Sequence, residues 1–405
     1  MDLNSDPQIQ LFEPAESVTD PEISVVVPAL NEELTITEFV AWCFAGFDEA
    51  HAKGEVLIVD SSNDRTAELA LAAGARVLHT PKRGLGRAYI DAIPFIRGRF
   101  VIMGDADCTY DFRNLAPFVD EYRNGAEFVM GTRFKGYIEP GSMPALHRYF
   151  GTPLTTWILN RMYSSHFSDI HCGMRGLTLE ALKRIDLQSQ SWEYASEIVL
   201  KSVHHELKTV EVPVRFLKDQ EGRVSHHKRA GWFSPFQAAW INLRAMFVYG
   251  AEFFVFRPGI VLLAVGLAIM LPVTFGPVDV GPLTFSLTSQ FIGAMLATVG
   301  LQGVFLGWLA RIFFDFPGRE TARLIHRFRY TRAALASFVT FLLGAGLVTP
   351  LVVRYIQNGL QLPSLTTANY LAITGLFFMV AGFSIFVFTL LLHAAAISTR
   401  RANAP

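Results

Sequence analysis

The run Phe100-Val101-Ile102-Met103-Gly104-Asp105-Ala106-Asp107 decides the fold of the first half of this chain. Its four consecutive apolar residues indicate a strand buried on both faces, and two aspartates follow where that strand would end. Carboxylates two positions apart on a turn can converge on one hard cation, which in turn holds a diphosphate. We therefore predict a metal site at Asp105 and Asp107. The alternative is a pair of solvated turn aspartates.

Three further apolar runs precede this one, at residues 23–27, 56–59 and 76–78, with helix-like segments between them. Apolar strands that alternate with helices are typical of a parallel sheet covered on both faces, so we predict an α/β domain. Ligands bind such sheets at the carboxyl ends of the strands. Asp60, at the end of the second run, can accept hydrogen bonds from a base or a ribose. Asp64 is better suited to begin the next helix as a cap.

A loop that combines glycines with cations, residues 82–87, precedes a helix expected near residues 86–96. Backbone N–H groups at a helix start and the guanidinium of Arg83 suit a phosphate. The alternative is an ordinary turn with solvated charges.

The second half of the chain changes character. Four apolar stretches are each long enough to cross about 30 Å of hydrocarbon at roughly 1.5 Å per residue. They predict a transmembrane domain over residues 253–405, with helices near residues 253–275, 289–314, 333–353 and 370–397. Aromatic residues recur at helical spacing in residues 229–252, which indicates an interfacial amphipathic helix; the alternative is a helix packed on the first domain.

The distribution of arginines predicts the orientation in the membrane. The link between the second and third spans and the C-terminus are basic, whereas the first link, residues 276–288, contains Asp279 and no basic residue. Positive charge favours the cytoplasmic side, so both termini and the first domain are expected in the cytoplasm. The basic residues are Arg319, Arg323, Arg327, Arg329, Arg332, Arg400 and Arg401.

Overall composition excludes some classes of protein. The net charge is −1, which gives no argument for nucleic-acid binding, and 51% of residues are hydrophobic, which is high for a soluble protein. The three cysteines, Cys43, Cys108 and Cys172, lack the spacing of a zinc site or a disulfide framework, and a reducing compartment fits them best. Residues 1–22 are acidic without an apolar core, which indicates a flexible tail rather than a signal peptide.

Taken together, these motifs resemble family 2 glycosyltransferases of the GT-A fold, a Rossmann-like α/β architecture, and within them the dolichol-phosphate mannose synthase-like group that glycosylates polyprenyl phosphates. The resemblance covers residues 23–228. It implies that Asp105 and Asp107 hold Mg²⁺ or Mn²⁺, with Thr109 as a candidate third ligand where the family often has glutamine. It also implies a nucleotide-sugar site, for which the candidates are Pro28, Leu30, Glu32, Asp60, Arg83, Ala106 and Arg223.

The same resemblance implies a site for a lipid phosphate. Arg133 and Arg148 are similar to the two arginines that receive this phosphate, and Thr152 is assigned with them; the alternative for the arginines is a surface ion pair. Asp169 matches a residue considered a base or a positioning group. Because the acceptor phosphate is already an anion at neutral pH, we assign Asp169 to orientation before base catalysis. Of Glu193 and Glu197, one is expected to line the site and the other to pair with a cation.

The predicted function is the metal-dependent, inverting transfer of a sugar from GDP-mannose or a UDP-hexose to dolichyl or undecaprenyl phosphate at the cytoplasmic membrane face. One rival is a processive polysaccharide synthase, against which the chain has no Q-x-x-R-W motif and only about four spans. Another is a catalytically inactive membrane scaffold or flippase-like protein, which the intact aspartates argue against. Whether the chain forms a homo-oligomer stays open.

Overall fold

The structure is a computed structural model that describes residues 6–163, 165–220, 240, 244, 247, 250, 252–313, 319–361 and 364–402. The chain divides into two compact units, residues 1–246 and 247–405. We call them the catalytic unit and the membrane unit and describe each by itself.

An eight-stranded sheet forms the centre of the catalytic unit, with strand order β1-β4-β3-β2-β5-β7-β6-β8. Strands β2 to β5 run parallel, β7 is antiparallel to its neighbours β5 and β6, and β8 is parallel to β6. All four strands predicted from apolar runs are therefore confirmed. The bounds are β1 Gln10–Phe12, β2 Ile23–Ala29, β3 Gly54–Asp60, β4 Arg76–His79, β5 Phe100–Met103, β6 Phe128–Ile138, β7 Arg175–Thr178 and β8 Thr209–Phe216.

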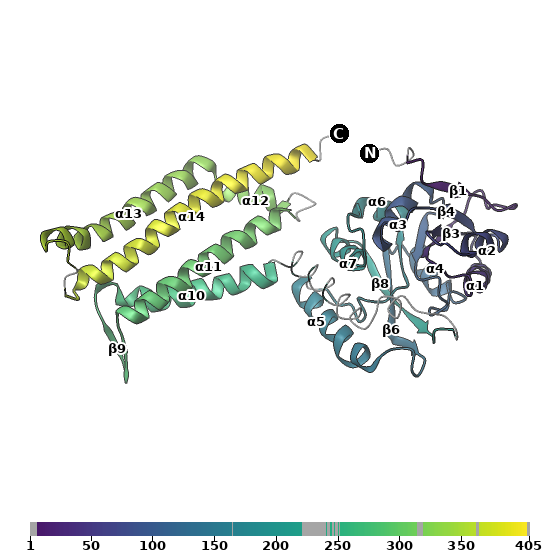
Figure 1. The fold of residues 1–405 in the computed structure, drawn as a ribbon, viewed down its shortest axis with the longest axis horizontal. Coiled ribbons are helices and arrows are strands. Elements are labelled where there is room, and N and C mark those ends of the chain that lie inside the picture. The colour runs from purple at the N-terminus through teal and green to yellow at the C-terminus, as the bar shows by residue number, and fades with distance from the viewer. Residues whose placement is uncertain are drawn as a thin grey trace. The chain divides into compact units, whose positions relative to one another are not determined.

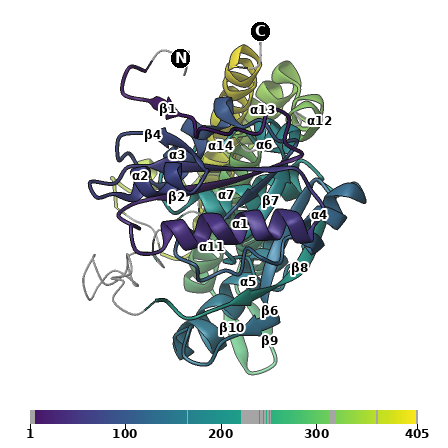
Figure 2. The ribbon, with the colours of Figure 1, turned by 90° about the vertical axis from the view of Figure 1, so that its right-hand side faces the viewer.

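Helices cover both faces of this sheet. In Figure 1, α1, α2 and α4 lie on one face and α3, α6 and α7 on the other, and Figure 2 views the sheet from the α1 side. Every residue of β3 is buried, as expected for a strand covered on both faces. The predicted α/β domain is confirmed. The helices are α1 Ile36–Glu49, α2 Thr66–Ala72, α3 Leu85–Ala92, η2 Ile93–Phe95, α4 Ala116–Arg123, η3 His147–Gly151, α5 Thr152–Tyr163, α6 Leu179–Ile185 and α7 Tyr194–His204.

The N-terminal segment from residue 6 onward packs along the sheet edge, where a flexible tail was expected. Strand β1 pairs with β4, and Glu13 accepts hydrogen bonds from Arg76 Nε at 3.1 Å and Arg97 Nη2 at 2.8 Å. Arg76 is 4% exposed and also bonds Glu55 at 2.9 Å. A buried guanidinium requires such partners, and a bare edge of β4 would expose unpaired backbone groups. The acidic residue Glu13 pairs with the buried Arg76. The acidic composition of this segment was therefore misread as the sign of a flexible tail.

Four apolar helices make up most of the membrane unit, which confirms the predicted number. The candidate spans are Phe253–Phe275, Leu287–Ile312, Tyr330–Gln357 and Thr367–Ile397. Helix α10 lies beside α11, and α13 beside α14 (Figure 1). Most of residues 229–252, where an interfacial helix was predicted, lie outside the described residues. The elements are η4 Glu252–Phe256, α10 Arg257–Met270, η5 Pro272–Phe275, β9 Val278–Val280, β10 Leu283–Phe285, α11 Leu287–Phe313, α12 Arg319–Arg327, α13 Tyr330–Gln357 and α14 Thr367–Ala402.

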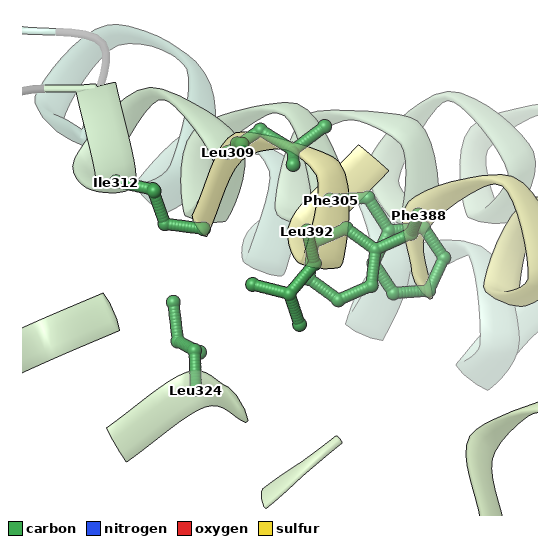
Figure 3. Packing of buried hydrophobic residues seen from close by; sticks show 7 residues of the cluster. Phe305, Leu309, Ile312, Leu324, Phe388 and Leu392 are labelled. Carbon is green, nitrogen blue, oxygen red and sulfur yellow. The ribbon is translucent and has the colours of Figure 1, made fainter. Parts of the chain in front are cut away.

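One buried cluster joins three of these helices. Phe305 of α11 stacks on Phe388 of α14, with ring centroids 4.7 Å apart and planes 15° from parallel. Leu324 of the short helix α12 packs into the same cluster (Figure 3). The contact fixes α12, which lies in the arginine-rich link, to the ends of two spans.

Candidate active site

The carboxyl ends of β2, β3 and β5 meet at one edge of the sheet, and most predicted site residues follow them. Ala29 of β2 lies opposite Asp60 of β3, and Val26 lies opposite Met103 of β5. Because the strands are parallel, the residues after these positions come together. The edge therefore gathers the predicted nucleotide-binding and metal-binding residues Pro28, Leu30, Glu32, Asp60, Asp105, Ala106 and Asp107.

A tight turn after β5, residues 104–109, positions the two aspartates of the predicted metal site. We call it the metal turn. Asp107 Oδ1 accepts hydrogen bonds from the backbone N–H of Thr109 at 3.0 Å and from its hydroxyl at 2.6 Å. Between them, Cys108 has φ +58°, a left-handed conformation that few L-residues adopt. Thr109 thus orients Asp107, and its role as a metal ligand stays a prediction.

The donor set fits a divalent cation. Asp105 and Asp107 are both half-buried, and carboxylate oxygens are the ligands that Mg²⁺ and Mn²⁺ prefer. Among the described residues, no group of three or more His, Cys, Asp or Glu side chains could hold a metal. Besides Asp105, Asp107 and the candidate Thr109, a diphosphate and water would supply ligands, which is how Mg²⁺ is commonly bound with phosphates.

A buried threonine connects the end of β2 to this turn. Thr35 Oγ1 donates to the carbonyl of Ala106 at 2.9 Å, and the N–H of Glu32 donates to Thr66 Oγ1 at 2.9 Å. Glu32 is 3% exposed. Thr35 Oγ1 also lies 3.4 Å from Glu32 Oε2, so this threonine contacts both the carboxylate of Glu32 and the metal turn. Sequence reasoning missed Thr35, because a lone threonine before a helix carries no distinguishing signal.

The aspartate that ends β3 and the one that follows it differ in their surroundings. Asp60 is 1% exposed, accepts the N–H of Ser62 at 3.3 Å and lies 3.4 Å from His79 Nδ1. Asp64 accepts the N–H of Thr66, the first residue of α2, at 3.0 Å. Asp64 therefore contacts the start of α2, but the cap expected of it is not confirmed, because the N-cap residue is Arg65. The nucleotide role of Asp60 stays a prediction.

Arg133 and Asp169 form a buried, bidentate ion pair. Arg133 Nε and Nη2 donate to the two carboxylate oxygens at 2.6 and 2.8 Å, and the backbone N–H of Arg133 adds a bond of 3.1 Å. Burial alone raises the pKa of Asp169, but the bonds and charge of Arg133 bring it below its ordinary value. For Arg133, the alternative of an ion pair on the surface is wrong, because the ion pair is buried. Nη1 makes no hydrogen bond to the described residues.

Gly173 brings the segment after Asp169 against the metal turn. Its N–H donates to Tyr110 Oη at 2.7 Å, and a Cβ at this position would lie 2.6 Å from Asp105 Oδ2. Only glycine permits so close an approach. On another side of the turn, Tyr89 Oη donates to the carbonyl of Gly104 at 3.1 Å, and its ring packs on Tyr194. Sequence reasoning missed these tyrosines, which spacing does not distinguish from core aromatics.

The other residues assigned to the acceptor phosphate lie in η3 and at the start of α5. Arg148 is half-buried with its guanidinium 5.5 Å from the ring centre of Tyr149, and Thr152 is 6% exposed. Thr155 of α5 lies within 2.9 Å of His171 Nε2, and the N–H of His171 donates to Asp169 at 3.3 Å. Helix α5 is therefore connected to the Arg133–Asp169 pair through His171.

The structure describes one of the two arginines assigned to the nucleotide-sugar site. Arg83 forms an ion pair with Asp6 at 2.7 Å and donates to Gln8 Oε1 at 2.9 Å, so in this structure it binds the N-terminal segment. Its role toward a diphosphate stays a prediction. Arg223 lies outside the described residues.

The two glutamates of the 192–197 region have separate surroundings. Glu197 is fully buried, pairs with Lys201 at 2.6 Å and accepts the N–H groups of Gln188 and Ser189. This confirms the cation partner expected for one of the pair. Glu193 is half-buried, and its Oε2 is buried without a hydrogen-bond partner among the described residues.

Comparison with known proteins agrees with this arrangement. The model of the glycosyl transferase family 2 matches residues 24–186, and the model of the glycosyltransferase family 2 C-terminal transmembrane region matches residues 308–396. The low-salt glycan biosynthesis hexosyltransferase Agl6 of Haloferax volcanii is 32% identical over 369 residues, covering 90% of this chain and 87% of that protein. The dolichyl-phosphate hexose transferase of the same organism is 28% identical over 210 residues, covering 52% of this chain and 89% of its own.

An α/β domain with carboxylates at its strand ends, followed by four apolar helices, is the arrangement of a membrane-bound glycosyltransferase. The chain belongs to glycosyltransferase family 2, the family that the motifs resembled. It is an integral membrane enzyme with a GT-A-type catalytic domain.

Proposed function

We propose that this chain transfers a hexose from a nucleotide-sugar, GDP-mannose or a UDP-hexose, to a polyprenyl phosphate at the cytoplasmic membrane face, with inversion at the anomeric carbon. One observation carries the proposal: Gly173 joins the Asp105–Asp107 turn to the segment that holds the buried Arg133–Asp169 pair. A donor diphosphate bound at Asp105 and Asp107 and an acceptor phosphate bound at Arg133 would then be adjacent. Relatives named for transfer to dolichyl phosphate support the acceptor class.

The donor would be bound at the sheet edge. Asp105 and Asp107 would hold Mg²⁺ or Mn²⁺, which when bound neutralises the charge of the departing nucleoside diphosphate. The buried carboxylate of Asp60 accepts hydrogen bonds from the base or ribose. Residues 28–32 contact the nucleotide from the end of β2, and the bond from Thr35 to Ala106 keeps them in register with the metal turn.

The acceptor phosphate would be bound by Arg133 and Arg148, with Thr152 beside them. Asp169 holds Nε and Nη2 of Arg133, which leaves Nη1 to bind a phosphate oxygen. Since the phosphate is already anionic and the pKa of Asp169 is lowered, Asp169 is a positioning residue that keeps its charge and needs no proton. Catalysis is then mainly orientation and electrostatic stabilisation.

The test uses the full-length protein in lipid nanodiscs with labelled GDP- and UDP-sugars, polyprenyl phosphate and Mn²⁺ or Mg²⁺, followed by mass spectrometry of the lipid product. We expect a single-sugar lipid, its loss on chelation of the metal, and its loss in Asp107→Ala. Asp120→Ala, which removes an exposed carboxylate of α4, is the matched control and should retain activity.

Each other result points elsewhere. A folded, fully active Asp107→Ala protein would exclude the metal site. A polymeric product would indicate a processive synthase, and no turnover with any donor would support an inactive membrane protein.

A further inference from the structure

The first residue of the metal turn, Gly104, is held by a buried tyrosine. Tyr89 Oη donates to the Gly104 carbonyl at 3.1 Å, and Tyr89 is 2% exposed. Burial raises the pKa of Tyr89 well above its ordinary value, so the hydroxyl keeps its proton and remains a donor. A buried hydroxyl or carbonyl without a partner would destabilise the fold, so this bond fixes the direction of the carbonyl that precedes Asp105.

The bond from Tyr89 begins where the pairing of the sheet ends. Within β5, the pairing with β2 and with β7 stops at Met103, and neither register continues to Gly104. The buried ring of Phe112 packs against this backbone, because a Cβ added at Gly104 would lie 2.5 Å from Phe112 Cζ. The backbone between β5 and Asp105 is therefore fixed by side chains rather than by strand pairing.

Tyr89 is itself held between two helices. Its ring packs on that of Tyr194, the first residue of α7, with centroids 4.9 Å apart and planes 34° from parallel. The backbone N–H of Arg87 donates to the carbonyl of Gln190 at 3.0 Å, which joins α3 to the segment before α7. Both helices lie on the same face of the sheet (Figure 1). The position of the Tyr89 hydroxyl is therefore set by α3 and α7 together.

We propose that Tyr89 is a positioning residue for the cation: its hydroxyl keeps the backbone of Gly104 in place, so that the carboxylate of Asp105 is already oriented for a divalent metal. This inference rests on the metal site of the proposed function. Groups that hold a metal ligand in position typically account for about 10- to 100-fold in metal affinity. Because Tyr89 belongs to α3, it also ties the metal turn to the helix that follows the loop of residues 82–87.

The same strand offers a matched control. Tyr122 Oη donates to the carbonyl of Val101 at 3.3 Å, and Tyr122 is also 2% exposed. Val101 lies inside β5, before the metal turn. Tyr89→Phe and Tyr122→Phe each remove one buried hydroxyl and one bond to a backbone carbonyl, but only the first bond reaches the metal turn. A purely structural role for Tyr89 would make the two variants behave alike.

The test measures binding rather than transfer, with the full-length protein in detergent. Calorimetry follows the binding of UDP and of GDP over a range of Mn²⁺ concentrations, and the melting temperature is recorded without metal. We expect Tyr89→Phe to need about 10-fold more Mn²⁺ for half-maximal nucleotide binding. Tyr122→Phe should need the same concentration as the unmodified protein. The melting temperatures of both variants should fall by similar amounts, since each loses one buried hydrogen bond.

Equal Mn²⁺ dependence in Tyr89→Phe and Tyr122→Phe would overturn the inference and leave the metal site of the proposed function intact. Asp107→Ala separates the two cases, because its loss of Mn²⁺-dependent binding establishes the site independently of Tyr89. If Asp107→Ala binds nucleotide with unchanged Mn²⁺ dependence, or the unmodified protein has no such dependence, the proposed metal site is wrong and the role of Tyr89 falls with it.

Discussion

At the scale of single residues, the pairing with Asp169 fixes the side chain of Arg133, the residue proposed to bind the acceptor phosphate. Two of its three guanidinium nitrogens bond the carboxylate, which offsets the cost of burying the charge. The orientation of the third nitrogen, Nη1, is fixed by this pairing. Removal of either partner would leave the other charge buried and alone, so the two residues act as one unit.

His171, which lies beside this pair, predicts a pH dependence of stability. Burial lowers the pKa of His171 to about 4, whereas an unfolded histidine titrates near 6.5. Between these values the unfolded chain binds a proton that the folded chain does not. The free energy of unfolding should therefore fall as pH drops from about 6.5 to about 4, by up to about 3 kcal/mol. At lower pH, protonation of Asp169, whose pKa is lowered, should remove further stability.

Thermal unfolding in detergent, followed by tryptophan fluorescence from pH 7.5 to 4, measures this effect. His171→Gln should show a shallower loss of stability with falling pH. His166→Gln, at an exposed position, should retain the dependence of the unmodified protein. Identical pH profiles for the unmodified protein and His171→Gln would contradict the assignment.

At the scale of elements, the backbone at Gly173 predicts an effect of one methyl group on the metal site. The added Cβ of Gly173→Ala would lie 2.6 Å from Asp105 Oδ2 and 2.9 Å from the Tyr110 ring, so the carboxylate must move. Misplacement of a catalytic group by about 1 Å can lower the rate by about 100-fold. We expect a loss of that size in transfer rate, with the apparent metal affinity also reduced.

The matched control is Gly346→Ala in α13, where an added Cβ meets no atom within 4 Å. It should retain activity and metal dependence. Near-ultraviolet circular dichroism verifies that both variants are folded. Normal metal affinity in a folded Gly173→Ala protein would show that Asp105 does not bind the cation.

The elements also show what sequence can and cannot predict. Strands such as β3 and β5 are continuous apolar runs, so their positions and the aspartates that follow them were predictable. Strand β1 was missed because its three residues carry no periodic pattern and depend on pairing with β4. The bond from Thr35 to Ala106 joins residues 71 positions apart, and the approach of Gly173 to Asp105 is likewise tertiary. Such contacts leave no signal in local spacing.

At the scale of the whole molecule, burial divides the spans into an inner and an outer pair. In the apolar stretch of each span, 44% of the residues are buried in α11 and in α14, against 17% in the first span and 11% in α13. Helices α11 and α14 therefore form the centre of the membrane unit. The basic link that contains α12 lies between the second and third spans, fixed by Leu324 to these two helices. Its charge is the basis for placing it in the cytoplasm.

Cysteine labelling tests this orientation, because the three native cysteines are buried and give a low background. Exposed positions are available in all three links: Thr284 in the first, Ala322 in the second and Asn358 in the third. With a membrane-impermeant maleimide on intact cells, Thr284→Cys and Asn358→Cys should react at once, whereas Ala322→Cys should react only after permeabilisation. The reverse pattern would place the catalytic unit outside the cell, where nucleotide-sugars are scarce. Equal reaction at positions 284 and 322 would mean that α11 does not cross the membrane.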